Sequence, residues 1–250
     1  MSRRIRAALI SVLSSSPVLL GWVRLIYCTL GLGTRIESDF LFDLARRQNN
    51  VFVLQVGAND GVGGDPIHQF VKSYKWKGLL LEPLPDIFEK LQGNYRNQKG
   101  IILHNAALAA RDGAMTFYRI KPGPDVPEWC DGLGSFSRET ILSHKHKFPT
   151  IENHVVAQTV EALSFKTLVE KFGICAIDVI VIDTEGYDYE VLKQIDFQRF
   201  RPELVIYEQI HLSDEVKKAS IEMLNNAGYD VHNSYNLNFV AVRRRGVAVV

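Results

Sequence analysis

Short apolar runs that end at a glycine or an acidic residue constrain the fold of this chain more than any other feature. The clearest run is Val51-Phe-Val-Leu-Gln-Val56, which Gly57 follows directly. Two more runs, at 177–182 and 204–207, are followed by Asp183 and Glu208. Runs this short and rich in Val and Ile are typical of strands buried on both faces of a parallel sheet.

Apolar residues at helical spacing separate these runs. After the first run, Asp65 and Pro66 have the residue types of a helix N-cap and a first helical residue, and apolar residues then recur up to Tyr74. Similar patterns predict helices over 83–95, 187–196 and 213–227, and strands over 78–81, 101–103, 229–232 and 238–242.

This alternation predicts an α/β, Rossmann-like fold with a seven-stranded, mostly parallel sheet that ends in an antiparallel hairpin. We place this domain at residues 37–250, because a chain of this length can bury a substantial core. Residues 111–160 interrupt the alternation with two strands around a loop rich in Pro and Gly. We expect them to form an inserted cap over the site; the alternative is an insertion that only completes the sheet edge. The cap residues suited to contact a sugar are Tyr118, Trp129, Asp131, Ser135 and Phe136.

Composition excludes some functions. The formal net charge is +1 and the basic residues are spread along the chain, which argues against a nucleic-acid partner. Short basic runs, such as His144–Lys147, are expected to be solvated surface. The three cysteines are far apart, so neither a disulfide framework nor a cysteine zinc site is indicated, and a cytoplasmic location is expected.

Residues 1–36 form a separate apolar or amphipathic segment. Arg3, Arg4 and Arg6 precede an apolar stretch that Pro17 and Arg24 interrupt. The uninterrupted pieces are shorter than the roughly 20 apolar residues that span a bilayer. We therefore expect a helix that packs on the domain or makes peripheral contact with a membrane surface, rather than a cleaved signal or a true span.

Small and polar residues follow the first three strands of the expected sheet, where open α/β sheets bind their ligands. The first turn is Gly57-Ala-Asn-Asp-Gly61, whose small residues let the backbone approach a ligand closely. Glu82 follows the second strand, about 25 residues after Gly57, a place that suits hydrogen bonds to ribose hydroxyls. Asn105 and Ala106 follow the third strand and suit an adenine edge. The nicotinamide fingerprint is not completed, because its third glycine position is Pro66.

A second group of polar residues follows the two later strands. Asp183, Glu185, Glu208 and His211 are expected around one cleft mouth, where one of them acts as a base that takes a proton from a hydroxyl. Alternatively, Asp183, Glu185 and Glu208 hold a divalent ion through their carboxylate oxygens. For Glu185, capping of the following helix is a further alternative.

With these residues in view, the chain resembles the FkbM-type methyltransferases. The resemblance implies S-adenosyl-L-methionine as donor and transfer to an oxygen, commonly on a sugar or a natural product. It implies that Gly57, Ala58, Asn59 and Gly61 cradle the methionine part of the donor, that Glu82 takes the ribose, and that Asn105 lies near the adenine. The matching segments are 53–61, 76–83, 105–108, 177–186 with 190–193, and 205–208.

One position departs from the family pattern. The family usually has Asp two residues before the first glycine, and this chain has Gln55. An amide forms hydrogen bonds but offers no charge to the ammonium group of the donor, a role that Asp60 is expected to take over. The expected donor-site residues are therefore Gln55, Gly57, Ala58, Asn59, Asp60, Gly61, Glu82, Pro83, Asn105 and Ala106.

The predicted function is O-methylation of a hydroxyl on a sugar, glycolipid or natural product. Two alternatives remain at the level of sequence. One is an NAD(P)-dependent sugar oxidoreductase or epimerase, which shares the sheet but needs the glycine fingerprint. The other is a non-catalytic, methyltransferase-like binding subunit, which the replacement at Gln55 favours.

Overall fold

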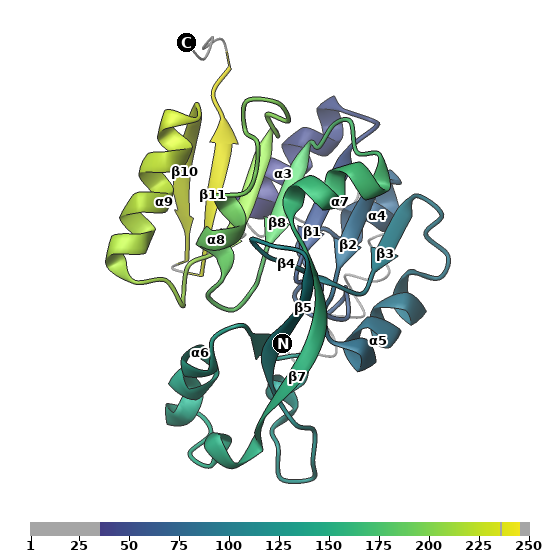
Figure 1. Ribbon diagram of the computed structural model, residues 1–250. Helices are drawn as coiled ribbons and strands as arrows, with labels where there is room; N and C mark the ends of the chain where they lie inside the picture. The colour runs from purple at the N-terminus through teal and green to yellow at the C-terminus, as the bar shows by residue number, and fades with distance from the viewer. Residues whose placement is uncertain (1–35, 236, 246–250) are drawn as a thin grey trace, which may run out of the picture.

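The computed structural model describes residues 36–235 and 237–245 and is built around a twisted sheet of seven strands (Figure 1). The order across the sheet is β10-β11-β9-β8-β1-β2-β3. The pairs among β3, β2, β1, β8 and β9 are parallel, whereas β11 runs antiparallel to both β9 and β10. The seven strands and the terminal hairpin predicted from the sequence are thus confirmed. Their bounds are β1 (Phe52–Val56), β2 (Lys77–Leu81), β3 (Ile101–His104), β8 (Val179–Ile182), β9 (Leu204–Glu208), β10 (Tyr229–Ser234) and β11 (Asn238–Arg243).

Helices cover both faces of this sheet because its central strands are apolar on both sides. In β1, Leu54 and Val56 face one core while Val53 faces the other, as the alternation of side chains along a strand requires. One core contains side chains of α7 (Phe165–Phe172), α8 (Asp188–Leu192) and α9 (Asp214–Asn226). The other contains side chains of α3 (Ile36–Arg47), α4 (His68–Tyr74) and α5 (Pro85–Tyr95).

Residues 111–160, which we call the cap, contribute to a long antiparallel arm that extends away from the main sheet (Figure 1). The arm belongs to a four-stranded sheet of order β4-β7-β5-β6, and β5 pairs with β7 along its whole length. A small apolar core that includes Cys130, Ile141 and Ile151 fills the far end of the cap. The elements are β4 (Ala107–Leu108), β5 (Gly113–Ile120), β6 (Gly134–Ser135), α6 (Arg138–Ser143) and β7 (Val155–Leu163), with short 3-10 helices at Glu128–Cys130, His144–His146 and Ile151–His154.

Several local predictions needed correction. Helix α4 begins at His68 rather than at Pro66, because the Asp65 carboxylate accepts hydrogen bonds from the backbone N–H groups of Ile67 and His68 and holds a turn ahead of the helix. Helices α6 and α7 were not predicted. Each has a serine as its N-cap, Ser137 and Ser164, whose hydroxyl accepts a hydrogen bond from a backbone N–H group of the first turn.

The prediction for the N-terminal segment 1–36 lies, apart from Ile36, outside the described residues. No helix in the described part of the chain has both the length and the apolar character needed to cross a membrane.

Candidate functional site

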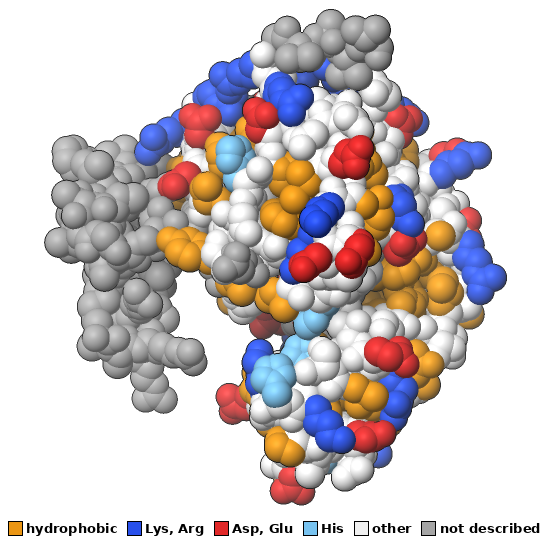
Figure 2. Space-filling model, turned by 90° about the vertical axis from the view of Figure 1, so that its left-hand side faces the viewer, with side chains coloured by type: hydrophobic (Ala, Val, Ile, Leu, Met, Phe, Trp, Pro, Cys, Tyr) orange, Lys and Arg blue, Asp and Glu red, His pale blue; other side chains and the backbone are white. Residues whose placement is uncertain are grey.

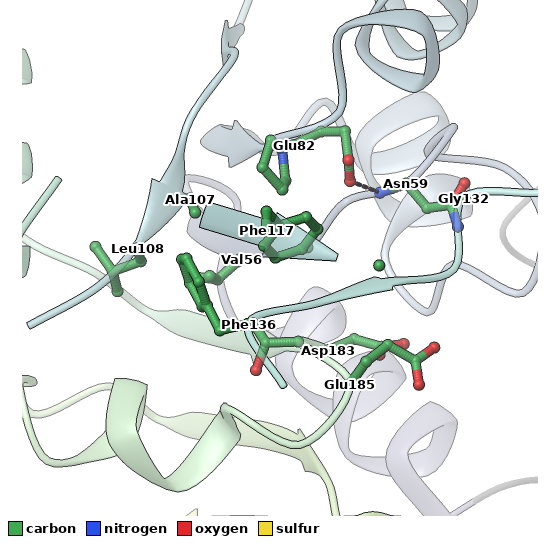
Figure 3. Close-up of a pocket in the computed structure, with 14 residues that line it drawn as sticks. Val56, Asn59, Glu82, Ala107, Leu108, Phe117, Gly132, Phe136, Asp183 and Glu185 are labelled. Carbon is green, nitrogen blue, oxygen red and sulfur yellow. Dashed lines mark hydrogen bonds between the residues drawn. The ribbon is translucent and has the colours of Figure 1, made fainter. Parts of the chain in front are cut away.

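Two pockets open at the carboxyl ends of the central strands. The first, which we call the cap pocket, lies between the sheet and the cap (Figure 3). The second, which we call the glycine-turn pocket, lies beside the turn that follows β1. Both are lined by Gly57, Asn59 and Asp183, so the two pockets lie next to each other at the sheet edge. The other lining residues of the cap pocket are Val56, Glu82, Pro83, Ala107, Leu108, Phe117, Gly132, Gly134, Phe136, Thr184 and Glu185. Those of the glycine-turn pocket are Gln55, Ala58, Gly63, Gly64, Asp65, Pro66, Val181, Ile182, Ile206, Glu208, Ile210, Leu237 and Asn238.

The turn after β1 brings two strand ends into direct contact. Gly57 has φ +79°, and a Cβ atom added there would lie 1.8 Å from the backbone oxygen of Asp183. Only glycine fits this position, because any side chain would collide with the backbone that follows β8. Asn59 also has a positive φ, of 50°, and backbone strain of this kind in a pocket wall is typical of ligand sites.

Glu82 joins this turn to the second strand. Its carboxylate accepts a hydrogen bond from the backbone N–H group of Asn59 at 2.9 Å (Figure 3). It accepts a second one from the backbone N–H group of Leu84, also at 2.9 Å. Burial raises the pKa of Glu82 to about 7, although the two hydrogen bonds and nearby Arg119 oppose the shift. Asn105 supports Glu82 from behind, because its Nδ2 atom donates to the Glu82 carbonyl oxygen at 2.7 Å.

The side chain of Gln55 forms a hydrogen bond with Asp65. The Gln55 Nε2 atom donates to Asp65 Oδ2 at 3.3 Å, and the Gln55 Oε1 atom is buried without a hydrogen-bond partner among the described residues. Both residues line the glycine-turn pocket. Asp60 was expected to supply the missing charge. Instead, its carboxylate accepts hydrogen bonds from the backbone N–H groups of Val62 and Gly63 within its own turn. It lines neither of the two pockets. Burial raises the pKa of Asp65 to about 6.

The four expected catalytic residues lie close together. His211 Nε2 lies 3.0 Å from Glu185 Oε2 and 3.9 Å from Glu208 Oε2. Asp183 lines both pockets and its side chain is exposed to them, while desolvation by the surrounding protein raises its pKa well above the usual value, with Glu185 as the next cause. Burial likewise raises the pKa of Glu208 to about 10, with Asp183 and Glu185 adding to the shift.

No lysine or arginine is among the described residues that line the two pockets. Carboxyl groups that raise one another's pKa in a space without an opposing cation favour a positively charged ligand. The same charge disfavours a pyrophosphate, which needs positive charge or a free helix N-terminus. The lining of the pockets therefore suits a cationic ligand better than a dinucleotide.

The cap contributes two aromatic side chains to the pocket wall. Phe136 was expected there, whereas Phe117 was not, and their rings pack edge to face at 5.1 Å between centroids. The Ser135 hydroxyl donates to the Glu185 backbone oxygen at 2.7 Å. Trp129 instead packs beside His144, and Asp131 forms an ion pair with Lys90 outside the cap pocket. Tyr118 packs against the small core of the cap.

His144 is the functional candidate that the sequence did not reveal. It lies in a basic run that was expected to be solvated, yet it is buried, and its Nδ1 atom has no hydrogen-bond partner among the described residues. One of its ring nitrogens lies within 4.8 Å of a carboxylate oxygen of Glu185 and of a ring nitrogen of His211. A buried histidine within a charged surface run has no local sequence signature, so only the fold identifies it.

Most of the expected donor-site residues reach the pocket walls. Asp60, Gly61, Asn105 and Ala106 do not: Gly61 packs under Tyr95 and Leu91, and Ala106 is fully buried. The expected donor-site residues that line a pocket are Gln55, Gly57, Ala58, Asn59, Glu82 and Pro83.

A family model, described as the methyltransferase FkbM domain, matches residues 55–231. The match covers more than half of the chain. It includes the glycine turn, Glu82 and the acidic residues Asp183, Glu185 and Glu208. The chain belongs to the FkbM methyltransferase family. With this membership, the sheet described above is the Rossmann-like fold of class I methyltransferases.

Solved structures with low sequence identity are similar to this family member. A methyltransferase FkbM from Methylobacillus flagellatus KT has 12% identity and a TM-score of 0.47, over 77% of this chain and 44% of that one. A precorrin-6y C5,15-methyltransferase from Geobacter metallireducens GS-15 has 12% identity and a TM-score of 0.43, over 82% and 87%. Aeropyrum pernix fibrillarin, solved with natively bound S-adenosyl-L-methionine, has 11% identity and a TM-score of 0.41, over 77% and 66%. The chain thus spans less than half of the length of the FkbM structure. No curated protein matches the chain by sequence.

Proposed function

We propose that this chain is an S-adenosyl-L-methionine-dependent O-methyltransferase that acts on a hydroxyl group of a sugar, glycolipid or natural product. The observation that carries the proposal is that two neighbouring pockets, both lined by Gly57, have carboxyl groups but no lysine or arginine in their described walls. Such a lining fits a nucleoside that carries a positive charge.

The donor fits the residues that are present. Glu82 would accept hydrogen bonds from the ribose hydroxyls, and Gly57, which has no side chain, lets the donor approach the backbone closely. Asp65 and the unpartnered Gln55 Oε1 atom offer acceptors to an ammonium group. Bound S-adenosyl-L-methionine supplies a methyl group on a positively charged sulfur, which is already activated for attack by an oxygen.

The remaining work of the protein is to align the acceptor oxygen, exclude water and remove a proton. Phe117 and Phe136 cover the cap pocket and offer apolar faces to an acceptor. Glu185 and His211 are suited to take the acceptor's proton, because their 3.0 Å separation lets either group share it with the other. Asp183 and Glu208 line the donor side of the site, and a bound cation would lower their raised pKa values and favour their charged forms.

The first experiment separates this proposal from the oxidoreductase alternative. We expect calorimetric titration of the full chain to show binding of S-adenosyl-L-methionine and none of NAD. Binding of NAD without binding of S-adenosyl-L-methionine would overturn the proposal.

The second experiment separates an enzyme from a binding subunit. Labelled donor is incubated with fractionated glycan, lipid and small-molecule extracts, and the expected result is label in a glycan, glycolipid or natural-product fraction. Asp183→Asn and Glu185→Gln variants that remain folded are expected to lose most of this transfer. Donor binding with no transfer to any fraction, or full activity in both variants, contradicts the catalytic proposal.

A further inference from the structure

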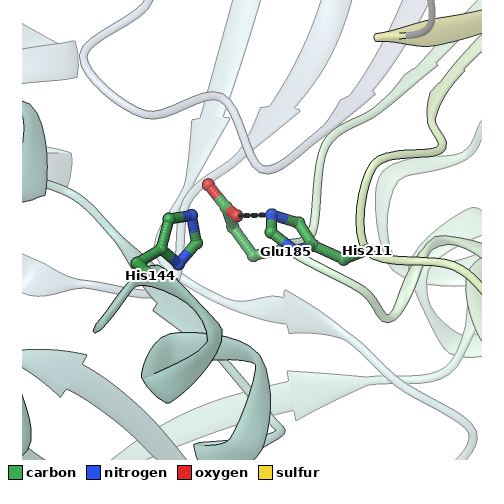
Figure 4. Close-up of side chains that lie close together, drawn as sticks. All are labelled: His144, Glu185 and His211. Atoms are coloured by element: carbon green, nitrogen blue, oxygen red, sulfur yellow. Dashed lines mark ion pairs between the residues drawn. The ribbon is translucent and has the colours of Figure 1, made fainter. Parts of the chain in front are cut away.

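Two histidines and a glutamate converge where the cap meets the main sheet. His144 lies at the junction of α6 and the 3-10 helix His144–His146, Glu185 follows β8, and His211 follows β9. Figure 4 shows the Glu185 carboxylate between the two imidazole rings. In the space-filling view, histidine side chains lie at the junction between the body and the cap (Figure 2). Three chain segments that are distant in sequence therefore each bring one potential metal ligand to the same point.

The spacing of these groups is close to that of a metal site. One ligand atom from each residue lies within 4.8 Å of the others, and His211 Nε2 is 3.0 Å from Glu185 Oε2. The imidazole rings of His144 and His211 have centroids 5.0 Å apart. An ion bound at about 2.0–2.2 Å from each ligand needs side-chain shifts on the order of only 1 Å.

Backbone contacts hold the three segments against one another. The Ser135 hydroxyl of the cap donates to the Glu185 carbonyl oxygen at 2.7 Å, and Glu185 itself has φ +51°. A Cβ atom added at Gly186 would lie 3.1 Å from Thr140 Oγ1 and 3.3 Å from His211 Cβ. The cap and the segments that follow β8 and β9 are thus in contact immediately beside the cluster. These contacts fix the backbone positions from which the three side chains project.

The character of the ligands selects the class of ion. His144 is 8% exposed, and its Nδ1 atom is buried without a partner in the described part of the chain. Two imidazoles with one carboxylate suit zinc and similar divalent transition metals, whereas magnesium and calcium prefer oxygen ligands. This group also differs from the all-carboxylate alternative considered from the sequence, because Asp183 and Glu208 lie outside it.

We propose that His144, Glu185 and His211 bind one divalent transition-metal ion that bridges the cap and the sheet. Three protein ligands leave a coordination position open, as in catalytic zinc sites. Glu185 also lines the cap pocket, so the open position is available to an oxygen of the acceptor, and with the ion bound Glu185 and His211 hold the metal instead of taking the acceptor's proton themselves. This last assignment rests on the proposed function; the metal site does not.

The test uses the full chain after removal of metal with a chelator. Titration with Co²⁺, followed by visible absorption and calorimetry, is expected to show one tightly bound ion that Zn²⁺ displaces and Mg²⁺ does not. His144→Gln and His211→Gln are each expected to weaken Co²⁺ binding about tenfold or more, since even outer-shell partners of a metal contribute about that much. His146→Gln is the matched control, because His146 is exposed, two residues away, and outside the group.

Hydrogen exchange supplies a readout that does not depend on activity. Co²⁺ is expected to slow exchange of the α6 amides in the original chain and in His146→Gln, but not in His144→Gln. Absence of Co²⁺ binding, equal weakening by His146→Gln, or displacement by Mg²⁺ overturns the metal site. Methyl transfer that persists without bound metal leaves the proposed function standing, and metal binding without donor binding leaves the metal site standing.

Discussion

Asp65 and Asp60 are separated by five positions but play different parts in the structure. Asp65 lies beside Gln55 in the wall of the glycine-turn pocket, whereas Asp60 holds the backbone of its own turn. The charge missing at Gln55 is therefore available from Asp65, which follows the turn and contacts Gln55.

We expect Asp65→Asn to weaken binding of S-adenosyl-L-methionine about tenfold, because the variant keeps an oxygen for the N–H groups of Ile67 and His68 but loses the negative charge. Asp60→Asn is the matched control and is expected to bind the donor normally. Calorimetric titration measures both. Equal affinities for the two variants would show that Asp65 does not contact the donor.

Glu82 makes stability depend on pH. Its folded-state pKa of about 7 lies above the ordinary value of 4.5 because the carboxyl is buried, with Asp86 raising and Arg119 lowering it. Between these two values the folded state retains a proton that the unfolded state has released, so the free energy of unfolding falls as pH rises through this window. The size of the effect is about 3 kcal/mol, and above pH 7 it levels off.

The Glu82→Gln variant cannot titrate at this position, so we expect it to lose this part of the pH dependence. Urea unfolding of the ligand-free protein at pH 5 and pH 8 measures the difference. Glu89→Gln, an exposed change on α5, is expected to keep the full dependence. A Glu82→Gln variant with an unchanged difference between the two pH values would contradict the assigned pKa.

At the scale of elements, a part-buried ion pair joins the cap to α5. The Arg119 side chain of β5 is buried, and both terminal nitrogens of its guanidinium donate to the Asp86 carboxylate on α5, with Nη2 at 2.8 Å from Oδ2. Arg119 lowers the pKa of Asp86 through these hydrogen bonds. Asp86 is half exposed, whereas Arg119 is buried. Replacing one partner is therefore expected to lower the free energy of unfolding by a different amount than replacing the other.

We expect Asp86→Asn to destabilise the protein more than Arg119→Met, because it leaves a buried guanidinium without its charge partner. The expected loss for Asp86→Asn is about 2 kcal/mol, below the range for fully buried pairs because the carboxyl is partly hydrated. Urea unfolding gives the free energies, and hydrogen exchange is expected to rise in β5 and β7. A larger loss for Arg119→Met would contradict this account.

At the scale of the whole molecule, we expect no nucleic-acid partner, because the charges of the chain are nearly balanced. The net charge is +1, and the described pocket walls contain acidic but no basic side chains. We expect no saturable binding of a single-stranded RNA of about 20 nucleotides at concentrations below about 100 µM. Fluorescence anisotropy at low and moderate salt measures this. Micromolar binding that weakens with salt would contradict the prediction.

Periodicity in the sequence predicted the main sheet well because each strand is defined by neighbouring residues. The run 51–56 is apolar and ends at a glycine wherever it lies in space, so its strand and turn can be recognised locally. The cap was harder, since its strand β6 and helix α6 are short and stabilised mainly by contacts with β5. Helix α7 was missed although its Ser164 N-cap was visible, because it follows the long strand β7 without a turn of the usual composition.

The sequence by itself determined that Gly57, Glu82, Asp183 and Glu208 meet at one edge, because residues that follow parallel strands of one sheet end up side by side. Only the tertiary structure decided that Asp65 accompanies Gln55, that Phe117 lines the cap pocket, and that His144 turns inward to Glu185 and His211. Those contacts join segments whose relative placement depends on how the cap packs on the sheet. No local pattern of residues encodes that packing.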